Sequence, residues 1–268
     1  MDPPDASPTL GAAALGLGYR LEVLDEVAST NDIALRRARD NGASRLWIVA
    51  RRQTGGRGRH GRPWDSPSGN LFASLMLIDP CDIARAPELG FVTGLALHEA
   101  VRALTGLDHP RLALKWPNDL LIDAAKCAGI LLEGHRLEAG RFVLVIGTGV
   151  NVAAVPPGLE QAATSLQAFA PAATAARLLT LLADEFARRF ASFVAAPGFD
   201  EAHFAEWGKR AHGIGSKVRV KLPQGEVEGK FHGLERGRLV LDTEAGRRTL
   251  DAGDLYVMNV TEASRQSA

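Results

Sequence analysis

The sequence predicts a mixed α+β protein, in which helices flank a central sheet and a small β-barrel module follows. Two observations lead to this prediction. Up to residue 212, short apolar runs alternate with longer segments whose apolar residues recur at helical spacing. From residue 213 onward, short alternating runs separated by glycine turns recur about every ten residues, which is typical of a small SH3-like or OB-like barrel. We expect the body over residues 19–212 and the β module over residues 213–262.

The elements of the body follow from local patterns. Ser29 has the character of a helix N-cap with Asp32 three residues later, and Asn41-Gly42 ends this first helix. The other expected helices cover residues 90–104, 172–194 and 199–210. The expected strands of the body are 19–27, 46–50, 71–78, 112–116, 128–132 and 142–150, and those of the β module are 217–222, 227–231, 238–241, 247–250 and 255–258.

Composition excludes several classes of protein. Lys and Arg number 31 and so do Asp and Glu, so the chain lacks the basic excess with which general nucleic-acid binders offset phosphate charge. No apolar run is long enough to span a membrane, and residues 1–18 lack the features of a signal peptide, so we expect them to form a flexible tail. Two cysteines without CxxC spacing fit a reducing, cytoplasmic location.

The Gly/Arg loop, residues 53–64, is the most informative segment. It runs Gln-Thr-Gly-Gly-Arg-Gly-Arg-His-Gly-Arg-Pro-Trp, so glycines alternate with Arg57, Arg59 and Arg62. Glycine lets the backbone approach an anion closely, and arginine offers paired donors to phosphate or carboxylate oxygens. The loop does not match a Walker phosphate loop. From composition alone, an anion cradle and a solvated basic loop or RNA contact remain alternatives.

A second constellation is Lys115-Trp-Pro-Asn-Asp119, with Lys126 seven positions later. It places Asn118 and Asp119 in a turn after an apolar strand, where a carboxylate could hold Mg²⁺ on a nucleotide. Asn-Asp is also an ordinary turn former, and Lys126 alone could be a surface lysine.

A third constellation, Gly147-Thr-Gly-Val-Asn151, follows an apolar strand. It lacks the third glycine and the helix of a dinucleotide fingerprint, so a Rossmann site is not expected. Asn151 could present its amide to a nucleotide or simply end the strand.

Together these segments resemble the biotin protein ligases, in the ordered set Ser29-Thr-Asn31, Gln53, Gly56-Arg-Gly-Arg-His-Gly61, Trp64, Lys115 to Asp119, Lys126-Cys-Ala-Gly-Ile130 and Gly147 to Asn151. The resemblance covers most of residues 24–152, and the β module is similar to the SH3-like C-terminal domain of that family. Since only about 18 residues precede the first expected strand, the chain resembles the monofunctional type without an N-terminal DNA-binding domain.

The resemblance implies that the chain activates biotin with ATP to biotinyl-AMP, releases pyrophosphate, and transfers biotin to a lysine of a carboxylase carrier protein, with Mg²⁺ as cofactor. It implies catalytic roles for Lys126 and Arg59. The implied biotin-binding residues are Ser29, Thr30, Asn31, Gln53, Gly56, Arg57, Gly58, Arg59, Lys126 and Gly129. The implied nucleotide-binding residues are Arg59, Arg62, Trp64, Asn118, Lys126 and Asn151, with Asp119 as the metal ligand. It also makes a homodimer plausible, and no nucleic-acid or membrane partner is expected.

Three other functions remain as hypotheses. Lipoate ligation or octanoyl transfer would use the same fold. A nucleic-acid binder would use the Gly/Arg loop and the basic strand 217–221, and an adaptor would use the β module alone.

Overall fold

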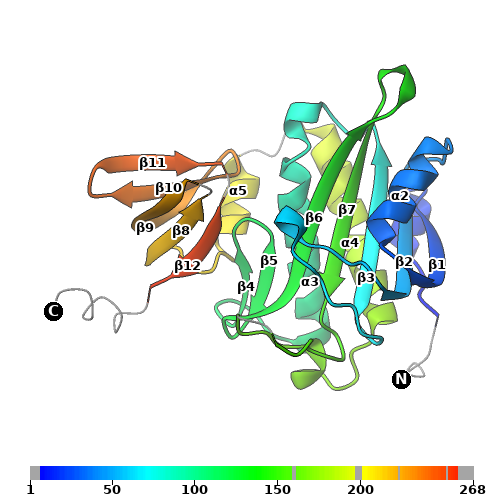
Figure 1. Cartoon of the computed structure of the whole chain (residues 1–268), viewed down its shortest axis with the longest axis horizontal. Helices are drawn as coiled ribbons and strands as arrows, with labels where there is room; N and C mark the ends of the chain where they lie inside the picture. The colour runs from blue at the N-terminus through cyan, green and yellow to red at the C-terminus, as the bar shows by residue number, and fades with distance from the viewer. Residues whose placement is uncertain (1–6, 159–160, 197–200, 223, 252, 259–268) are drawn as a thin grey trace.

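The computed structural model describes residues 7–158, 161–196, 201–222, 224–251 and 253–258. Its body is built on one seven-stranded sheet of order β1-β2-β3-β7-β6-β5-β4, shown in Figure 1. Only β1 and β2 pair in parallel, and the other neighbours are antiparallel. The strands are β1 (Arg20–Val27), β2 (Leu46–Gln53), β3 (Leu71–Ile78), β4 (Leu112–Lys115), β5 (Asp119–Ile122), β6 (Ala125–Arg136) and β7 (Phe142–Val150).

Helices cover the two faces of this sheet unequally. The helices are α1 (Ala12–Gly16), α2 (Thr30–Arg39), α3 (Glu88–Thr105), α4 (Ala175–Ala195) and α5 (Glu201–Gly208). On one face, α3 and α4 bury the main core, where Trp47 of β2 packs edge-on against Phe186 of α4 with ring centroids 6.1 Å apart. On the other face, Ile33 of α2 belongs to a smaller core with Ile48 and Val145. Among the described residues, no helix covers the part of this face formed by β6 and the end of β7, and the cavity described below lies there.

The C-terminal module is a five-stranded antiparallel sheet of order β11-β10-β9-β8-β12. Its strands are β8 (Lys217–Leu222), β9 (Gly225–Glu235), β10 (Arg238–Thr243), β11 (Gly246–Leu250) and β12 (Asp254–Val257). The expected boundary at residues 212 and 213 falls between α5 and β8, and residues 259–262 of the expected module lie outside the described residues. The predicted fold class, a mixed body followed by a β module, is confirmed.

Three local expectations need correction. Residues 119–122, expected within a turn region, form the short strand β5. The expected flexible tail is wrong for residues 10–16, because α1 packs on α4, Ala14 is buried, and its backbone N–H donates to Asp184 Oδ1 at 2.8 Å. Ser29 occupies the N-cap position of α2, but its side chain makes no capping hydrogen bond.

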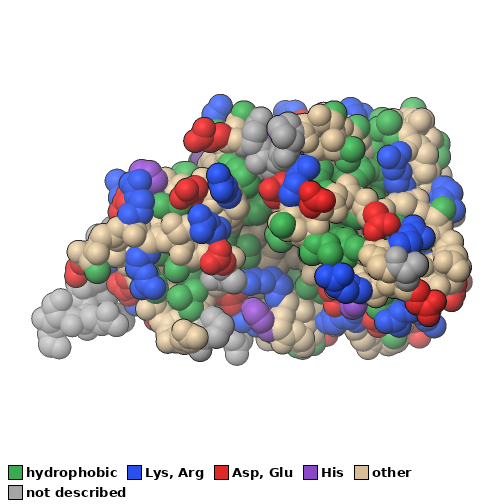
Figure 2. Space-filling model, turned by 90° about the horizontal axis from the view of Figure 1, so that it is seen from above, with side chains coloured by type: hydrophobic (Ala, Val, Ile, Leu, Met, Phe, Trp, Pro, Cys, Tyr) green, Lys and Arg blue, Asp and Glu red, His purple; other side chains and the backbone are tan. Residues whose placement is uncertain are grey.

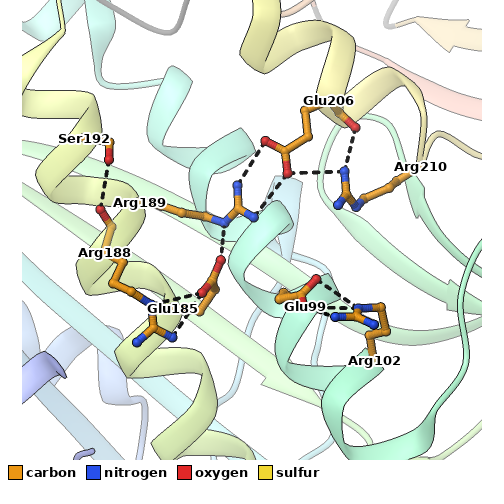
Figure 3. A network of polar contacts seen from close by, with 8 residues as sticks. All are labelled: Glu99, Arg102, Glu185, Arg188, Arg189, Ser192, Glu206 and Arg210. Carbon is orange, nitrogen blue, oxygen red and sulfur yellow. Dashed lines mark hydrogen bonds and ion pairs between the residues drawn. The ribbon is translucent and has the colours of Figure 1, made fainter. Parts of the chain in front are cut away.

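An ion-pair network joins the last two helices of the body, as Figure 3 shows. Arg189 of α4 contacts Glu185 at 2.7 Å and Glu206 of α5 at 3.1 Å, and Arg210 contacts Glu206 at 3.2 Å. The chain after α5 then bonds to β4, since the N–H of Leu114 donates to the carbonyl of Arg210 at 2.7 Å. These contacts fix the body at the point where the chain leaves for the C-terminal module.

Among the helices of the described ranges, none combines the length and the apolar character needed to cross a bilayer.

The buried imidazole of His98 predicts a pH dependence of folding stability. Its Nε2 lies 3.2 Å from the carbonyl oxygen of Leu112, and burial lowers its pKa from 6.5 to about 4. As pH falls below 6.5, His98 becomes protonated in the unfolded chain but stays neutral in the folded protein. The free energy of unfolding therefore decreases as pH approaches 4. The loss at pH 4 should be about 3 kcal/mol, because one unit of pKa shift corresponds to about 1.4 kcal/mol.

The variant His98→Gln keeps an N–H donor for Leu112 but does not titrate in this range. Urea unfolding at pH 7 and pH 4.5 should therefore show a smaller decrease in the free energy of unfolding for His98→Gln than for the wild type. Equal decreases would show that His98 does not contribute.

Candidate functional site

A cavity of about 350 Å³ lies between the uncovered face of the main sheet, the Gly/Arg loop and the first part of β12. The floor is made by β6 and β7, which pair so that Gly129 lies opposite Gly149 and Leu131 opposite Gly147. Because strand side chains alternate between faces, Gly147 and Gly149 of β7 occupy the same face. Three positions of this face, Gly129, Gly147 and Gly149, therefore leave part of the sheet under the cavity without side chains.

The indole of Trp64 lies on this part of the sheet. A Cβ atom built on Gly149 would stand 2.7 Å from the Trp64 ring, and one built on Gly129 would stand 3.2 Å from it. Gly149 is therefore required for this approach, and a side chain at residue 129 would make a tight contact with the ring. Lys126 Nζ lies 5.4 Å from the centroid of the Trp64 ring, a cation–π distance.

A chain of neutral polar groups forms a buried end of the site. Ser74 of β3 is fully buried, and its Oγ lies 2.7 Å from Thr30 Oγ1 and 2.5 Å from Asn31 Oδ1. Gln53 Oε1 accepts from the backbone N–H of Thr30 at 2.8 Å and lies 3.0 Å from Thr30 Oγ1. These groups come from the start of α2, the end of β2 and the middle of β3, so the sheet register brings them together.

Arg57 anchors the Gly/Arg loop to the wall beside this polar chain. Its Nε and Nη2 donate to Glu133 of β6 at 3.1 and 3.0 Å, and Nη2 also donates to Asp32 of α2 at 2.8 Å. Hydrogen bonds to Asp32 and Glu133 raise the pKa of Arg57 well above its ordinary value, so its charge is fixed. Asp32, expected at a helix cap, thus serves as a partner of the loop.

Lys126, near the start of β6, lines the cavity. Its Nζ forms an ion pair with Asp119 Oδ1 at 2.9 Å, and both side chains are largely buried. Lys115, which pairs with Asp119 in the β4–β5 register, also lines the cavity, and burial lowers its pKa despite the opposing charge of Asp119. The cavity therefore holds more positive than negative side chains on this wall.

Arg59 and Arg62 reach the wall that the C-terminal module supplies. Arg62 Nη2 donates to Asp254 Oδ2 at 2.7 Å, and Arg59 Nη1 lies 3.4 Å from Asp254 Oδ1 and 3.4 Å from Asn118 Oδ1. Burial opposes ionisation of Asp254, but the hydrogen bond from Arg62 and the surrounding positive charges hold its pKa below its usual value. The Gly/Arg loop is thus bonded to both walls of the cavity.

A metal would have few protein ligands here. Within the described ranges, no group of three or more His, Cys, Asp or Glu side chains could hold a metal ion. Asp119 is already paired with Lys126. A single carboxylate ligand is enough for a Mg²⁺ ion that keeps its waters and is bound mainly by substrate phosphates. It is not enough for an ion held by protein side chains alone.

The structure brings nearly all the predicted site residues to one cavity. Those that line it are Ser29, Thr30, Asn31, Gln53, Arg57, Gly58, Arg59, Arg62, Trp64, Asn118, Asp119, Lys126, Gly129 and Asn151. Gly56 is not among the lining residues: its carbonyl accepts from the Trp64 N–H at 2.9 Å, and a Cβ there would meet the Trp64 carbonyl at 2.4 Å. Asn151 also has a structural contact, since its Nδ2 donates to the carbonyl of Thr164 at 3.2 Å.

Sequence reasoning missed Glu133, Ser74, Asp254 and Tyr256, of which the last two line the cavity. Alternation from Gly129 would have placed Glu133 on the cavity face of β6, because residues 129, 131 and 133 share one face of a strand. Nothing local signals that Asp254 and Tyr256 reach the cavity, since that depends on how the two sheets meet.

Comparison with known proteins agrees with this geometry. The sequence profile of the biotin/lipoate A/B protein ligase family matches residues 23–151, and that of the biotin protein ligase C-terminal domain matches residues 213–258. The biotin–[acetyl-CoA-carboxylase] ligase of Paracoccus denitrificans is 35% identical over 241 residues, which cover 87% of this chain and 99% of that protein. The chain belongs to the biotin protein ligase family. The resemblance noted in the sequence is confirmed.

Other members of the biotin protein ligase family support the match over both parts of the chain. The corresponding ligase of Mycobacterium tuberculosis is 34% identical, with 90% of each chain covered. The biotin protein ligase of Aquifex aeolicus, solved in complex with biotin and ATP, has a TM-score of 0.76 and 28% identity, covering 90% of this chain and 99% of that one.

The glycine floor gives a prediction about stability. A Cβ on Gly147 would stand 2.5 Å from Asn31 Oδ1, so Gly147→Ala must displace the buried Asn31 amide and should cost about 1–3 kcal/mol of folding stability. Gly233 lies in β9 with no atom within 4 Å of such a Cβ, which makes Gly233→Ala the matched control. Urea unfolding should show a clear loss for Gly147→Ala alone; identical curves for both variants would contradict the close packing of Asn31 on the floor.

Proposed function

We propose that this chain is a biotin protein ligase, which activates biotin with ATP and transfers it to a lysine of a carboxylase carrier protein. The observation that carries the proposal is the position of Lys126. It lines one cavity together with the neutral polar side chains of residues 30, 31 and 53 and with the positive side chains of Arg59, Arg62 and Lys115. An acid bound through its neutral ring by the polar residues would bring its carboxylate to Lys126. A nucleotide bound by the positive residues would bring its phosphate to the same lysine.

The first step forms biotinyl-AMP. The biotin carboxylate attacks the α-phosphorus of ATP, the bond between the α- and β-phosphates breaks, and pyrophosphate leaves. Two anions must approach each other, so fixed positive groups in a partly buried site are the expected source of rate. Lys126 would stabilise the charge that develops between carboxylate and phosphate, while Arg59 and Arg62 would bind phosphate oxygens. Asp119 would be the carboxylate offered to a Mg²⁺ ion that arrives on the nucleotide.

The polar chain favours biotin over lipoate or octanoate. A cyclic urea offers two N–H donors and one acceptor, which the hydroxyls of Ser29 and Thr30 and the amides of Asn31 and Gln53 can match in a buried setting. The end groups of lipoate and octanoate offer no N–H, so the hydrogen bonds that a cyclic urea would add to this network would be lost, at about 1 kcal/mol each. Lipoate or octanoate activation therefore remains the second candidate, to be tested by substrate choice.

In the second step, the neutral amine of the carrier lysine attacks the acyl carbon, forms an amide and releases AMP. We infer that the Gly/Arg loop covers the acyl-adenylate and limits its hydrolysis, because Arg57 bonds to one wall and Arg59 and Arg62 to the other. Trp64 would pack against the adenylate from the floor of the site, with Gly129 beneath it. Asn118 and Asn151, which also line the cavity, would contact the nucleotide.

Partner, assembly and location complete the proposal. We propose that the carrier is a carboxylase domain that presents a biotin-accepting lysine. We also propose that the chain forms a homodimer and acts in the cytoplasm. A nucleic-acid role is less well supported. Figure 2 shows positive and negative side chains interspersed on the face it presents, without the single-sign patch typical of nucleic-acid binders.

Pyrophosphate exchange into ATP, measured with biotin, lipoate or octanoate, tests the proposal. We expect exchange with biotin, and a decrease of about 10²–10³-fold for Lys126→Ala, the range found when a preorganised electrostatic contact is removed. Lys209→Ala, at an exposed lysine just after α5, is the control and should keep wild-type exchange.

Folded protein without exchange for any acid would overturn the ligase proposal. Exchange with lipoate or octanoate but not with biotin would replace it by the second candidate.

A further inference from the structure

Glu133 is a partly buried acid on β6 that the proposed mechanism does not use. Its carboxylate accepts from Asn31 Nδ2 at 2.6 Å and from Arg57 Nε and Nη2 at 3.1 and 3.0 Å. It thus contacts both the buried polar chain and the Gly/Arg loop. A carboxylate in this ion pair can only accept hydrogen bonds, so Asn31 must present its NH₂ group to Glu133 and its Oδ1 to Ser74.

The orientation of Asn31 decides where the two hydroxyl protons of the chain go. Because Asn31 Oδ1 accepts, Ser74 must donate to it over the 2.5 Å contact. Ser74 has only one proton, so Thr30 must donate across the 2.7 Å contact to Ser74. Thr30 Oγ1 also lies 3.0 Å from Gln53 Oε1, but its single proton serves the shorter contact to Ser74, so Gln53 Oε1 receives only the backbone N–H of Thr30.

A second contact fixes Gln53 independently. Gln53 Nε2 donates to Ser66 Oγ at 3.1 Å, and Ser66 Oγ donates to the carbonyl of Trp64 at 3.0 Å. The Gln53 amide therefore keeps Oε1 turned toward Thr30. With the hydroxyl protons directed toward Glu133, free lone pairs remain on Thr30 Oγ1 and Gln53 Oε1, and both residues line the cavity.

We propose that Glu133 is a positioning residue that directs proton donation along Thr30, Ser74 and Asn31, and so makes this end of the cavity an acceptor of N–H donors. This role of Glu133 rests on the proposed function: Glu133 would favour the binding of acids that carry a cyclic urea. Without the charge at residue 133, Asn31 could turn over and donate to Ser74. Ser74 would then donate to Thr30 and Thr30 to Gln53, which would use up the acceptors.

The test is Glu133→Gln, which keeps the size of the side chain and removes its charge. In biotin-dependent pyrophosphate exchange it should raise the KM for biotin by about tenfold, the equivalent of one good hydrogen bond, with little change in kcat or in the KM for ATP. Desthiobiotin keeps the cyclic urea, so its KM should rise in parallel. Glu138→Gln, at an exposed acid beyond the far end of β6, should match the wild type.

Asp32→Asn separates this role from the anchoring of Arg57. Asp32 contacts Arg57 but has no contact with Asn31 among the hydrogen bonds of the described residues, so its removal should raise the KM for biotin much less than Glu133→Gln does. An equal rise would assign the effect to Arg57 and overturn the inference. So would an unchanged KM for biotin in Glu133→Gln, or an equal rise in the KM for ATP. Absence of biotin-dependent exchange in the wild type would overturn the proposed function itself, and this inference with it.

Discussion

The register of β6 on β7 is the constraint on which the site depends. Pairing Gly129 with Gly149 and Leu131 with Gly147 leaves part of the sheet without side chains, and three features occupy the space this creates. Trp64 lies on Gly149, the Asn31 amide fits against Gly147, and Glu133 emerges two residues beyond Leu131 on the same face. A shift of one residue would exchange the two faces of β6 and move Glu133 into the main core, where its charge would have no partner. The register is therefore specified by the apolar side chains on the opposite face, such as Ile130 and Ile146 in the main core.

Charge balance explains how a cavity rich in arginine and lysine can belong to a stable fold. Four cations of the cavity have an acidic partner close by: Arg57 has Asp32 and Glu133, Lys126 has Asp119, and Arg59 and Arg62 share Asp254. A phosphate or carboxylate entering the cavity competes with these acids for the same donors. Binding therefore exchanges one set of charged hydrogen bonds for another, so the net gain per contact is smaller than the strength of an isolated pair suggests.

Much of the fold and of the site could be predicted from the sequence, because the signals are local. The apolar period of α4, the apolar run of β3 and the glycine turns of the C-terminal module depend only on neighbouring residues. The Gly/Arg loop and the segments around Lys115 and Lys126 likewise carry recognisable residue types at fixed spacing. The short β5 was missed because four residues between two turns give too little periodicity. The helix α1 was missed because its order comes from burial against α4, which lies far away in the sequence.

The remaining site residues could not be predicted, because they are partners across long sequence separations. Arg57 meets Glu133 over 76 residues and Arg62 meets Asp254 over 192. To predict either pairing, one must know the order of the strands in the sheet. The second pairing also requires knowing how the C-terminal module lies against the body. That placement has a chemical consequence, since Arg59 and Arg62 come from the body and Asp254 and Tyr256 from the module. A module that moved away from the body would remove the acidic partner of two arginines and open that wall of the cavity, so the position of β12 and the charge balance of the site change together.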